Sequence, residues 1–169
     1  MVQLHVTNVK MFMNKLLASE AFDSFLLEEA TIMTANTYTI NGHINREFFA
    51  DIDTLQEELP TYEFAKWSDM KVTVFQLIKG KRTPLQIKMV LQLKPESVAA
   101  VLKMGDTTVT ADDIKSFVVT IRFDQNGCKV VTAVSYRNFV LDKTPDKLWD
   151  QEMKKFLTRK EIVFEDETI

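Results

Sequence analysis

Apolar and polar residues follow the same order of patterns twice along the chain. Residues 2–6 alternate apolar with polar side chains, which is the period of a half-buried strand. The apolar positions of residues 9–17 then fall on one stripe of a helix, and Asn8 stands where a helix N-cap belongs. The pattern therefore predicts a strand followed directly by a helix at the start of the chain.

The remainder of the first half is expected to contain three more strands. Residues 29–40 and 43–49 are predicted to pair through Asn41-Gly42, because Asn-Gly favours a two-residue hairpin turn. Residues 51–68 are rich in acids, so we expect a loop or a single helical turn there. Residues 70–79 are predicted as the third strand.

The second half begins at residues 85–93 with the most regular strand pattern of the chain. Pro95 suits the first turn of a helix whose buried stripe would include Val98 and Val101. Residues 117–123 alternate into Asn126-Gly127, which predicts a second hairpin. A two-residue turn at this Asn-Gly pair would set Phe123 opposite Val130.

A final helix is predicted over residues 144–160, because Thr144-Pro145 combines a cap with a first-turn proline. Four apolar residues are expected to face the core: Trp149, Met153, Phe156 and Leu157. Four basic residues are expected on the outer side or near the C-terminal end: Lys147, Lys154, Lys155 and Arg159. Residues 161–169 are acidic and are expected to fray.

The two Asn-Gly pairs lie 85 residues apart, and the same offset aligns the first strand and helix of each half. Such a repeat constrains a fold more than a short motif does. We therefore expect one α+β domain over residues 1–169, built from two pseudo-symmetric β-α-β-β-β repeats with largely antiparallel sheets. The repeats would span about residues 1–79 and 85–142, followed by the C-terminal helix.

Composition narrows the class of protein without naming an activity. The net charge of −3 argues against a protein that coats nucleic acid over its whole surface. Four glycines leave no room for a Gly-rich phosphate-binding loop, and no apolar stretch is long enough to cross a membrane. The first residues do not resemble a secretory signal, and one cysteine allows no internal disulfide, so we expect a cytoplasmic protein.

Two resemblances follow from these patterns. The predicted element order, together with the strand-to-helix segment from Leu85 to Met104, resembles one domain of a sliding DNA clamp. That resemblance implies two related units and a DNA-facing pair of helices, although these helices carry few basic residues. Separately, residues 75–85 and 149–157 resemble stretches of a small bacterial family of unknown function, which implies no site residues.

The densest basic cluster is the segment Lys79-Gly80-Lys81-Arg82, and the last helix adds further lysines. These side chains could bind an anion or an acidic partner. A solvated turn and a solvated helix face explain the same residues, and sequence alone does not show whether the two groups meet. The candidate contact residues are Lys79, Lys81, Arg82, Lys154 and Lys155.

Other reactive residue types are sparse, and each has a structural explanation. Asp51 and Asp53 have the spacing of two metal ligands, but acids in loops are usually solvated. His5, His43 and Cys128 have no neighbours at a spacing typical of a catalytic dyad. The sequence therefore predicts no catalytic residue, no metal and no cofactor.

Aromatic residues are the remaining candidates for contact with a partner. Tyr62, Phe64 and Trp67 would either close one end of a sheet or anchor a protein partner. Of the adjacent Phe48 and Phe49, one must leave the main core if both lie on a strand.

Three hypotheses about function remain. The leading one is a non-enzymatic binding or assembly module that contacts a protein partner or a second copy of itself. The second is a clamp-like protein associated with nucleic acid. The third is a small-molecule binder, because seven antiparallel strands followed by a helix also resemble a helix-grip fold, whose sheet wraps a ligand cavity.

Overall fold

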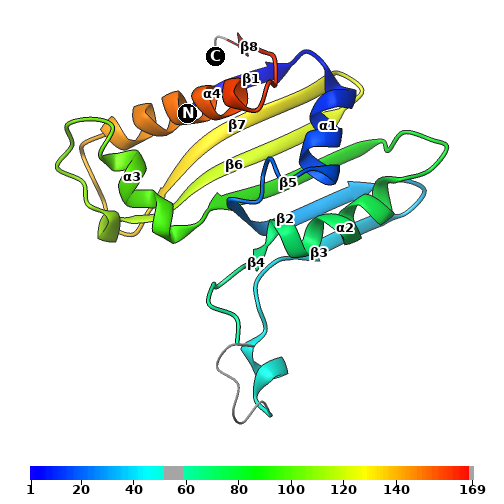
Figure 1. The fold of residues 1–169 in the computed structure, drawn as a ribbon, viewed down its shortest axis with the longest axis horizontal. Helices are drawn as coiled ribbons and strands as arrows, with labels where there is room; N and C mark the ends of the chain where they lie inside the picture. Colours follow the sequence, from blue (N-terminus) through cyan, green and yellow to red (C-terminus); the bar gives the residue numbers. More distant parts are fainter. Residues whose placement is uncertain (52–58, 168–169) are drawn as a thin grey trace.

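The computed structural model describes residues 1–51 and 59–167, which fold around one open antiparallel sheet (Figure 1). The sheet has eight strands. Their bounds are β1 Gln3–Val6, β2 Phe25–Met33, β3 Thr37–Asn41, β4 Ala65–Lys66, β5 Gln86–Leu93, β6 Ile114–Asp124, β7 Gly127–Tyr136 and β8 Phe164–Glu167. In space the strands follow the order β3-β2-β5-β6-β7-β1-β8, and the short β4 pairs with β2.

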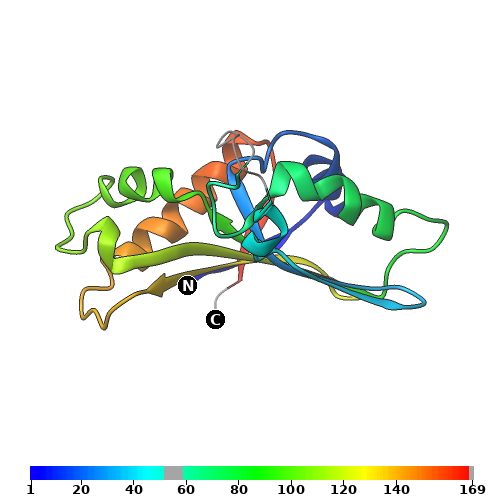
Figure 2. The same cartoon turned by 90° about the horizontal axis from the view of Figure 1, so that it is seen from below.

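Four α-helices lie on one face of this sheet (Figure 2). They are α1 Val9–Ala18, α2 Trp67–Ile78, α3 Val98–Leu102 and α4 Thr144–Arg159. Short 3₁₀ turns precede or separate them: η1 Arg46–Phe49, η3 Pro95–Ser97 and η4 Ala111–Asp113. The core lies between the helices and the sheet, because alternate residues of β5, such as Ile87, Met89 and Leu91, point toward the helices and are buried.

The α+β class, the antiparallel sheet and the C-terminal helix are confirmed. The first strand and helix form as predicted, and the Asn8 side chain accepts a hydrogen bond from the Met11 amide at 3.1 Å. In η4, Thr110 and Asp113 form a reciprocal capping box. Each of these capping interactions joins residues that are three apart in the sequence, so it forms without depending on the packing of distant elements.

The prediction of a hairpin at Asn41-Gly42 was wrong. β2 and β3 turn at residues 34–36, where the Thr34 amide donates to the Asn36 carbonyl at 2.8 Å. Gly42 instead passes beside β2 at an irregularity between Leu27 and Glu29. A Cβ added to Gly42 would stand 1.8 Å from the Leu27 carbonyl oxygen, so this glycine permits a close backbone approach rather than a turn.

The strands predicted for residues 43–49 and 70–79 were also wrong. Residues 46–49 form η1, and His43 makes one isolated bridge to Phe64. Residues 70–79 mostly belong to α2, since Trp67 and Val74 are buried at helical spacing while the intervening Val72 is 61% exposed. Part of the predicted 51–68 loop, residues 52–58, lies outside the described residues.

The second hairpin forms where it was predicted but with a different register. Phe123 faces Cys128 rather than Val130, because Gln125 and Asn126 make the turn and Gly127 takes a φ of +113°. The shift is two residues, so the predicted faces are kept and Phe117, Val119 and Ile121 remain in the core.

Within the tail that was predicted to fray, residues 164–167 form an edge strand. β8 pairs with β1 from Gln3–Glu167 to Val6–Phe164, and Ile162 just before it is buried. The Glu167 side chain accepts hydrogen bonds from Gln3 and from Lys129, the latter at 3.0 Å. These bonds lower the pKa of Glu167, and the bond from Gln3 has the largest effect.

Element order recurs in the two halves, whereas strand pairing does not. Each half runs strand, helix, two strands and helix, from β1 to α2 and from β5 to α4, with the short β4 added in the first half and β8 after the second. β5 lies between β2 and β6, while its counterpart β1 lies between β7 and β8. The clamp-like topology is therefore not confirmed: a pseudo-dyad would give β1 and β5 equivalent neighbours.

Candidate ligand-binding site

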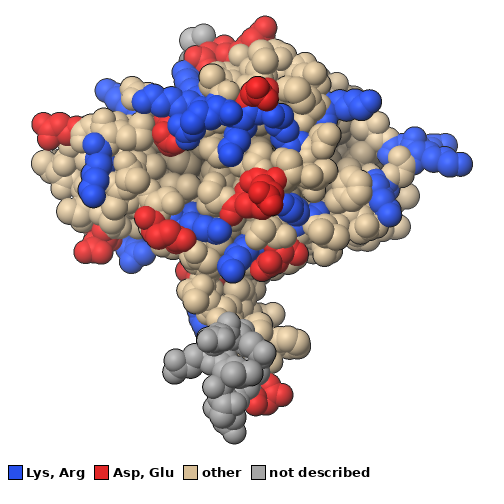
Figure 3. Space-filling model, viewed as in Figure 1, with Lys and Arg blue, Asp and Glu red and all other residues tan. Residues whose placement is uncertain are grey.

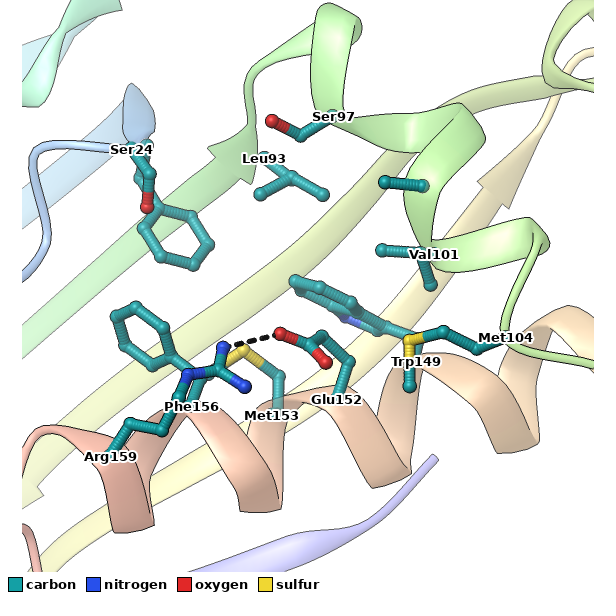
Figure 4. Close-up of a pocket in the computed structure, with 12 residues that line it drawn as sticks. Ser24, Leu93, Ser97, Val101, Met104, Trp149, Glu152, Met153, Phe156 and Arg159 are labelled. Atoms are coloured by element: carbon teal, nitrogen blue, oxygen red, sulfur yellow. Dashed lines mark hydrogen bonds and ion pairs between the residues drawn. The ribbon is translucent and has the colours of Figure 1, made fainter.

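A cavity of about 260 Å³ lies between α3, α4 and the ends of β2 and β5 (Figure 4). Its walls come from β2, β5, η3, α3 and α4 and from residues next to them, which the fold brings to one place. The lining residues are Ser24, Phe25, Leu93, Ser97, Ala100, Val101, Met104, Trp149, Glu152, Met153, Phe156 and Arg159. Most of these side chains are apolar, so the cavity has the character of a binding site for a small organic molecule.

Packed aromatic rings form the inner wall. The Trp149 ring stacks on Phe117 at a centroid distance of 5.1 Å, and its Nε1 donates to the Val118 carbonyl at 2.9 Å. Phe25 and Phe156 meet edge to face at 5.5 Å. Because these rings are at most 8% exposed and are held by neighbours, the wall is largely formed before any ligand arrives.

The sequence of α4 explains how one helix supplies five of the twelve lining residues. Trp149, Glu152, Met153, Phe156 and Arg159 follow the three- and four-residue spacing of one helix face. That face packs against the sheet through its apolar members and carries one acid and one base at its border. α4 begins at Thr144, whose amide donates to Asp142 at 2.9 Å.

Polar groups lie toward the rim of the cavity (Figure 4). Arg159 Nη2 donates to Glu152 Oε1 at 2.6 Å, across two turns of α4. The Glu152 side chain is 21% exposed and that of Arg159 is 56% exposed, so the acid is the inner member of the pair. Ser24, which is exposed, and Ser97, which is half-buried, add hydroxyl groups on the opposite side.

The structure does not bring the predicted basic residues into one patch. Lys79, Lys81 and Arg82 are exposed in the connection from α2 to β5, at one end of the molecule (Figures 1 and 2). Lys154 and Lys155 lie on α4, where Figure 3 shows Lys and Arg side chains gathered along the helix. Lys154 Nζ bonds to Asp166 at 2.7 Å, so this lysine also ties α4 to β8.

The three residues considered for reactivity from the sequence, Cys128, His5 and His43, lie in different surroundings. Cys128 is fully buried, and burial raises the pKa of its thiol to about 12. The thiol therefore stays protonated and packs as a small core residue, whereas a nucleophilic cysteine needs the thiolate form. His5 has a buried Nδ1 without a hydrogen-bond partner among the described residues, 3.7 Å from Glu167. His43 Nε2 lies 3.7 Å from Glu63 on the surface.

The two-carboxylate metal hypothesis has one member outside the described residues, because Asp53 falls in the segment 52–58. Within residues 1–51 and 59–167, no group of three His, Cys, Asp or Glu side chains is arranged to hold a metal ion. Over the same described ranges, no helix has both the length and the apolar content to cross a bilayer.

The aromatic residues predicted before α2 separate into different roles. Trp67 is fully buried, and its Nε1 donates to the Leu16 carbonyl of α1 at 2.9 Å. Tyr62 hydrogen-bonds to Glu96; this bond raises the pKa of Tyr62 and lowers that of Glu96. Phe48 is 80% exposed and Phe49 is half-buried, so neither belongs to the core, because both lie in η1 and not on the predicted strand.

These features define an α+β protein with an antiparallel sheet, a terminal helix and an apolar cavity beneath that helix. Residues 15–165 match the model of a family described as a family of unknown function, DUF5721, and the chain belongs to this family. No curated protein and no solved structure shows significant similarity to the chain.

The sequence did not predict where the cavity lies or which residues line it, and in particular it did not predict that Arg159 lies at the rim. The prediction grouped Arg159 with the outward lysines, whereas the structure places it at the rim beside Glu152. One signal was present: Glu152 and Arg159 are seven residues apart, so both border the stripe of Trp149 and Phe156. The contributions of Ser24 and Leu93 depend on strand pairing and had no local signal.

Proposed function

We propose that this chain binds a small, mainly apolar organic molecule in the cavity between α3 and α4. The observation that carries the proposal is the cavity itself: about 260 Å³ lined by apolar side chains with a few polar groups at its rim. An apolar protein cavity of roughly 150 Å³ accepts benzene, and sites for drug-sized ligands begin near 300 Å³. A single aromatic ring with a short substituent therefore has the appropriate size.

The walls favour binding because little has to move. Trp149 is held by stacking and by its bond to Val118, and Phe25 and Phe156 support one another. A preformed wall spares a ligand the cost of ordering side chains on binding. The surface members Ala100 and Met104 lie on or just after α3, and they mark the route by which a ligand reaches this wall.

Of the three functions considered from sequence, small-molecule binding is the one that a specific feature supports. Assembly with a protein partner stays a prediction: the exposed Phe48 and Phe139 lie on separate parts of the chain. Contact with nucleic acid, the clamp-like arrangement and a cytoplasmic location also stay predictions. The resemblance to a small family of unknown function fits the family match, which carries no activity to transfer, and the bacterial origin stays a prediction.

A matched pair of substitutions on α3 tests the proposal. Ala99 and Ala100 are adjacent and both exposed, but Ala100 alone lines the cavity. We expect isothermal titration with 2-phenylethanol to give saturable one-to-one binding to the wild type. Ala100→Trp should weaken it at least about tenfold by filling the opening, whereas Ala99→Trp should leave it unchanged.

Two results contradict the proposal. The first is the lack of saturable binding of 2-phenylethanol to the wild-type protein. The second is equal binding by wild type and Ala100→Trp, which would place the ligand elsewhere. Thermal unfolding of both variants serves as the folding control, since substitutions at exposed positions usually change stability by no more than about 0.5 kcal/mol.

A further inference from the structure

The ion pair at the rim gives the cavity a preference among ligands of similar shape. Glu152 and Arg159 are the acid and the base among its described lining residues. They differ in depth, since the Glu152 side chain is 21% exposed and that of Arg159 is 56% exposed. A charged ligand that enters the cavity displaces the member of this ion pair that has the same charge. The displacement costs less free energy for the side chain that is already more exposed to solvent.

Arg159 is the group that can leave at lower cost. It is the last residue of α4, where the carbonyl end of the helix favours a positive charge whether or not Glu152 is its partner. Most of its side chain already contacts solvent. Glu152 is held mid-helix against the apolar wall, so loss of its cationic partner without replacement would leave a half-buried carboxylate unpaired.

The inner wall also suits a cation. The faces of Phe, Tyr and Trp attract ammonium groups, and the Trp149, Phe25 and Phe156 rings all line this cavity. The Phe156 ring already attracts one cation, because Lys160 Nζ lies 5.8 Å from its centroid. Aromatic rings beside a carboxylate form a combination that recognises an alkylammonium group.

We infer that the ligand of this cavity is a small aromatic or aliphatic amine, bound as its ammonium ion, which replaces Arg159 as the partner of Glu152. This inference rests on the proposed function, since it assigns a chemical class to the molecule that the cavity binds. The apolar body of the amine occupies the space beside Trp149 and Met153. Its ammonium group faces Glu152, and Arg159 moves toward solvent.

Three compounds with the same phenyl body separate the contributions of shape and charge. 2-Phenylethylamine carries a positive charge at pH 7, 2-phenylethanol is neutral and phenylacetate is negative. Titration calorimetry on the wild-type protein should give the tightest binding for the amine, about tenfold tighter than the alcohol, and the weakest for the carboxylate.

Two variants assign the preference to its residues. Glu152→Gln should abolish the advantage of the amine over the alcohol while the alcohol still binds. Arg159→Gln should leave the amine bound at least as tightly as in the wild type, because it removes a competing cation. Lys155→Gln, on the exposed side of the same helix, is the control and should change none of the three affinities.

The outcomes that overturn the inference are distinct from failure of the proposed function. Tightest binding of phenylacetate, lost in Arg159→Gln, would assign the cavity to carboxylates. Equal binding of all three compounds would show an apolar site without charge preference. Either result refutes the amine assignment and keeps the cavity as a binding site, whereas no binding of any of the three refutes the proposed function as well.

Discussion

The two helix pairs that cover the sheet contain one tryptophan each, and the tryptophans attach to different partners. In the first half, Trp67 of α2 donates its indole proton to the Leu16 carbonyl of the neighbouring helix α1. In the second half, Trp149 of α4 donates to the Val118 carbonyl of strand β6. The first bond joins helix to helix, and the second joins helix to sheet.

That difference explains where the cavity lies. α1 and α2 are further connected by Lys71, whose Nζ bonds to the Ser19 carbonyl and to Asp23 just after α1. α3 has only five residues and packs against α4 over this short length, and the cavity lies beside that contact. The same element order therefore gives a helix pair joined by hydrogen bonds in one half and a helix pair beside a binding site in the other.

The largest expected effect tests whether the two halves share one core. Phe22 contacts the rings of Phe12 in α1 and Phe156 in α4, at centroid distances of 5.8 and 5.2 Å. Phe22→Ala should lower the free energy of unfolding by about 3–5 kcal/mol in one cooperative transition, measured by urea denaturation. Phe48→Ala, at an exposed ring, should change it by less than about 0.5 kcal/mol. Two separate transitions in the wild type would show that the halves fold independently.

A smaller effect is expected from the two Asn-Gly pairs, which the structure uses differently. Gly42→Ala places a methyl group against the Leu27 backbone, which cannot give way, and should cost about 2–3 kcal/mol. Gly127→Ala places it against the His5 ring at 2.9 Å and at a φ of +113°, and should cost about 1 kcal/mol. Thermal unfolding of both variants measures the difference, and equal losses would contradict the distinction.

The tryptophan comparison itself can be tested by paired substitutions. Trp67→Phe and Trp149→Phe each remove a buried indole donor, so each should lower the free energy of unfolding by about 1–2 kcal/mol. Of the two variants, only Trp149→Phe should also weaken the binding of 2-phenylethanol, because Trp149 lines the cavity and Trp67 does not. A matching loss of binding in Trp67→Phe would show that the cavity is not confined to the second half.

The smallest expected effect is at β8, which has no counterpart in the first half. A lowered pKa means that Glu167 stabilises the folded state above its ordinary pKa of 4.5, and this contribution is lost as the pH falls below that value. Amide chemical shifts of residues 164–167 should therefore move between pH 5 and pH 3. Glu167→Gln should remove the part of this movement that Glu167 causes, which is expected at its own amide and at that of its β1 partner Gln3, while Glu165→Gln should keep that part.

Local signals in the sequence predicted those elements whose ends are set by neighbouring residues. Asn8 before α1, Thr144-Pro145 at the start of α4 and the alternation of β5 each describe a few consecutive residues, and all three elements form. The signal at Asn41-Gly42 was ambiguous, since glycine also serves a close backbone approach. Residues 70–79 contain β-branched side chains, but Val74 is buried while Val72 faces solvent, which is the spacing of a helix packed on one face and not of a strand.

The candidate site was less predictable, because its walls are far apart in sequence. Phe25, Val101 and Trp149 meet only after β2, α3 and α4 pack on the same sheet. The basic residues singled out from sequence form dense local runs, yet they remain solvent-exposed or, like Lys154, join surface elements. Charged residues at the border of an apolar helix stripe, Glu152 and Arg159, were the local signal of the site, and the sequence prediction did not use it.

The indole NMR signals of the protein test the account most directly, because the chain has two tryptophans, one in each helix pair. The variants Trp67→Phe and Trp149→Phe assign the two signals. On titration with 2-phenylethylamine, the Trp149 signal should shift saturably while the Trp67 signal stays in place. Shifts of equal size in both signals, or in neither, would contradict a ligand-binding cavity confined to the second helix pair.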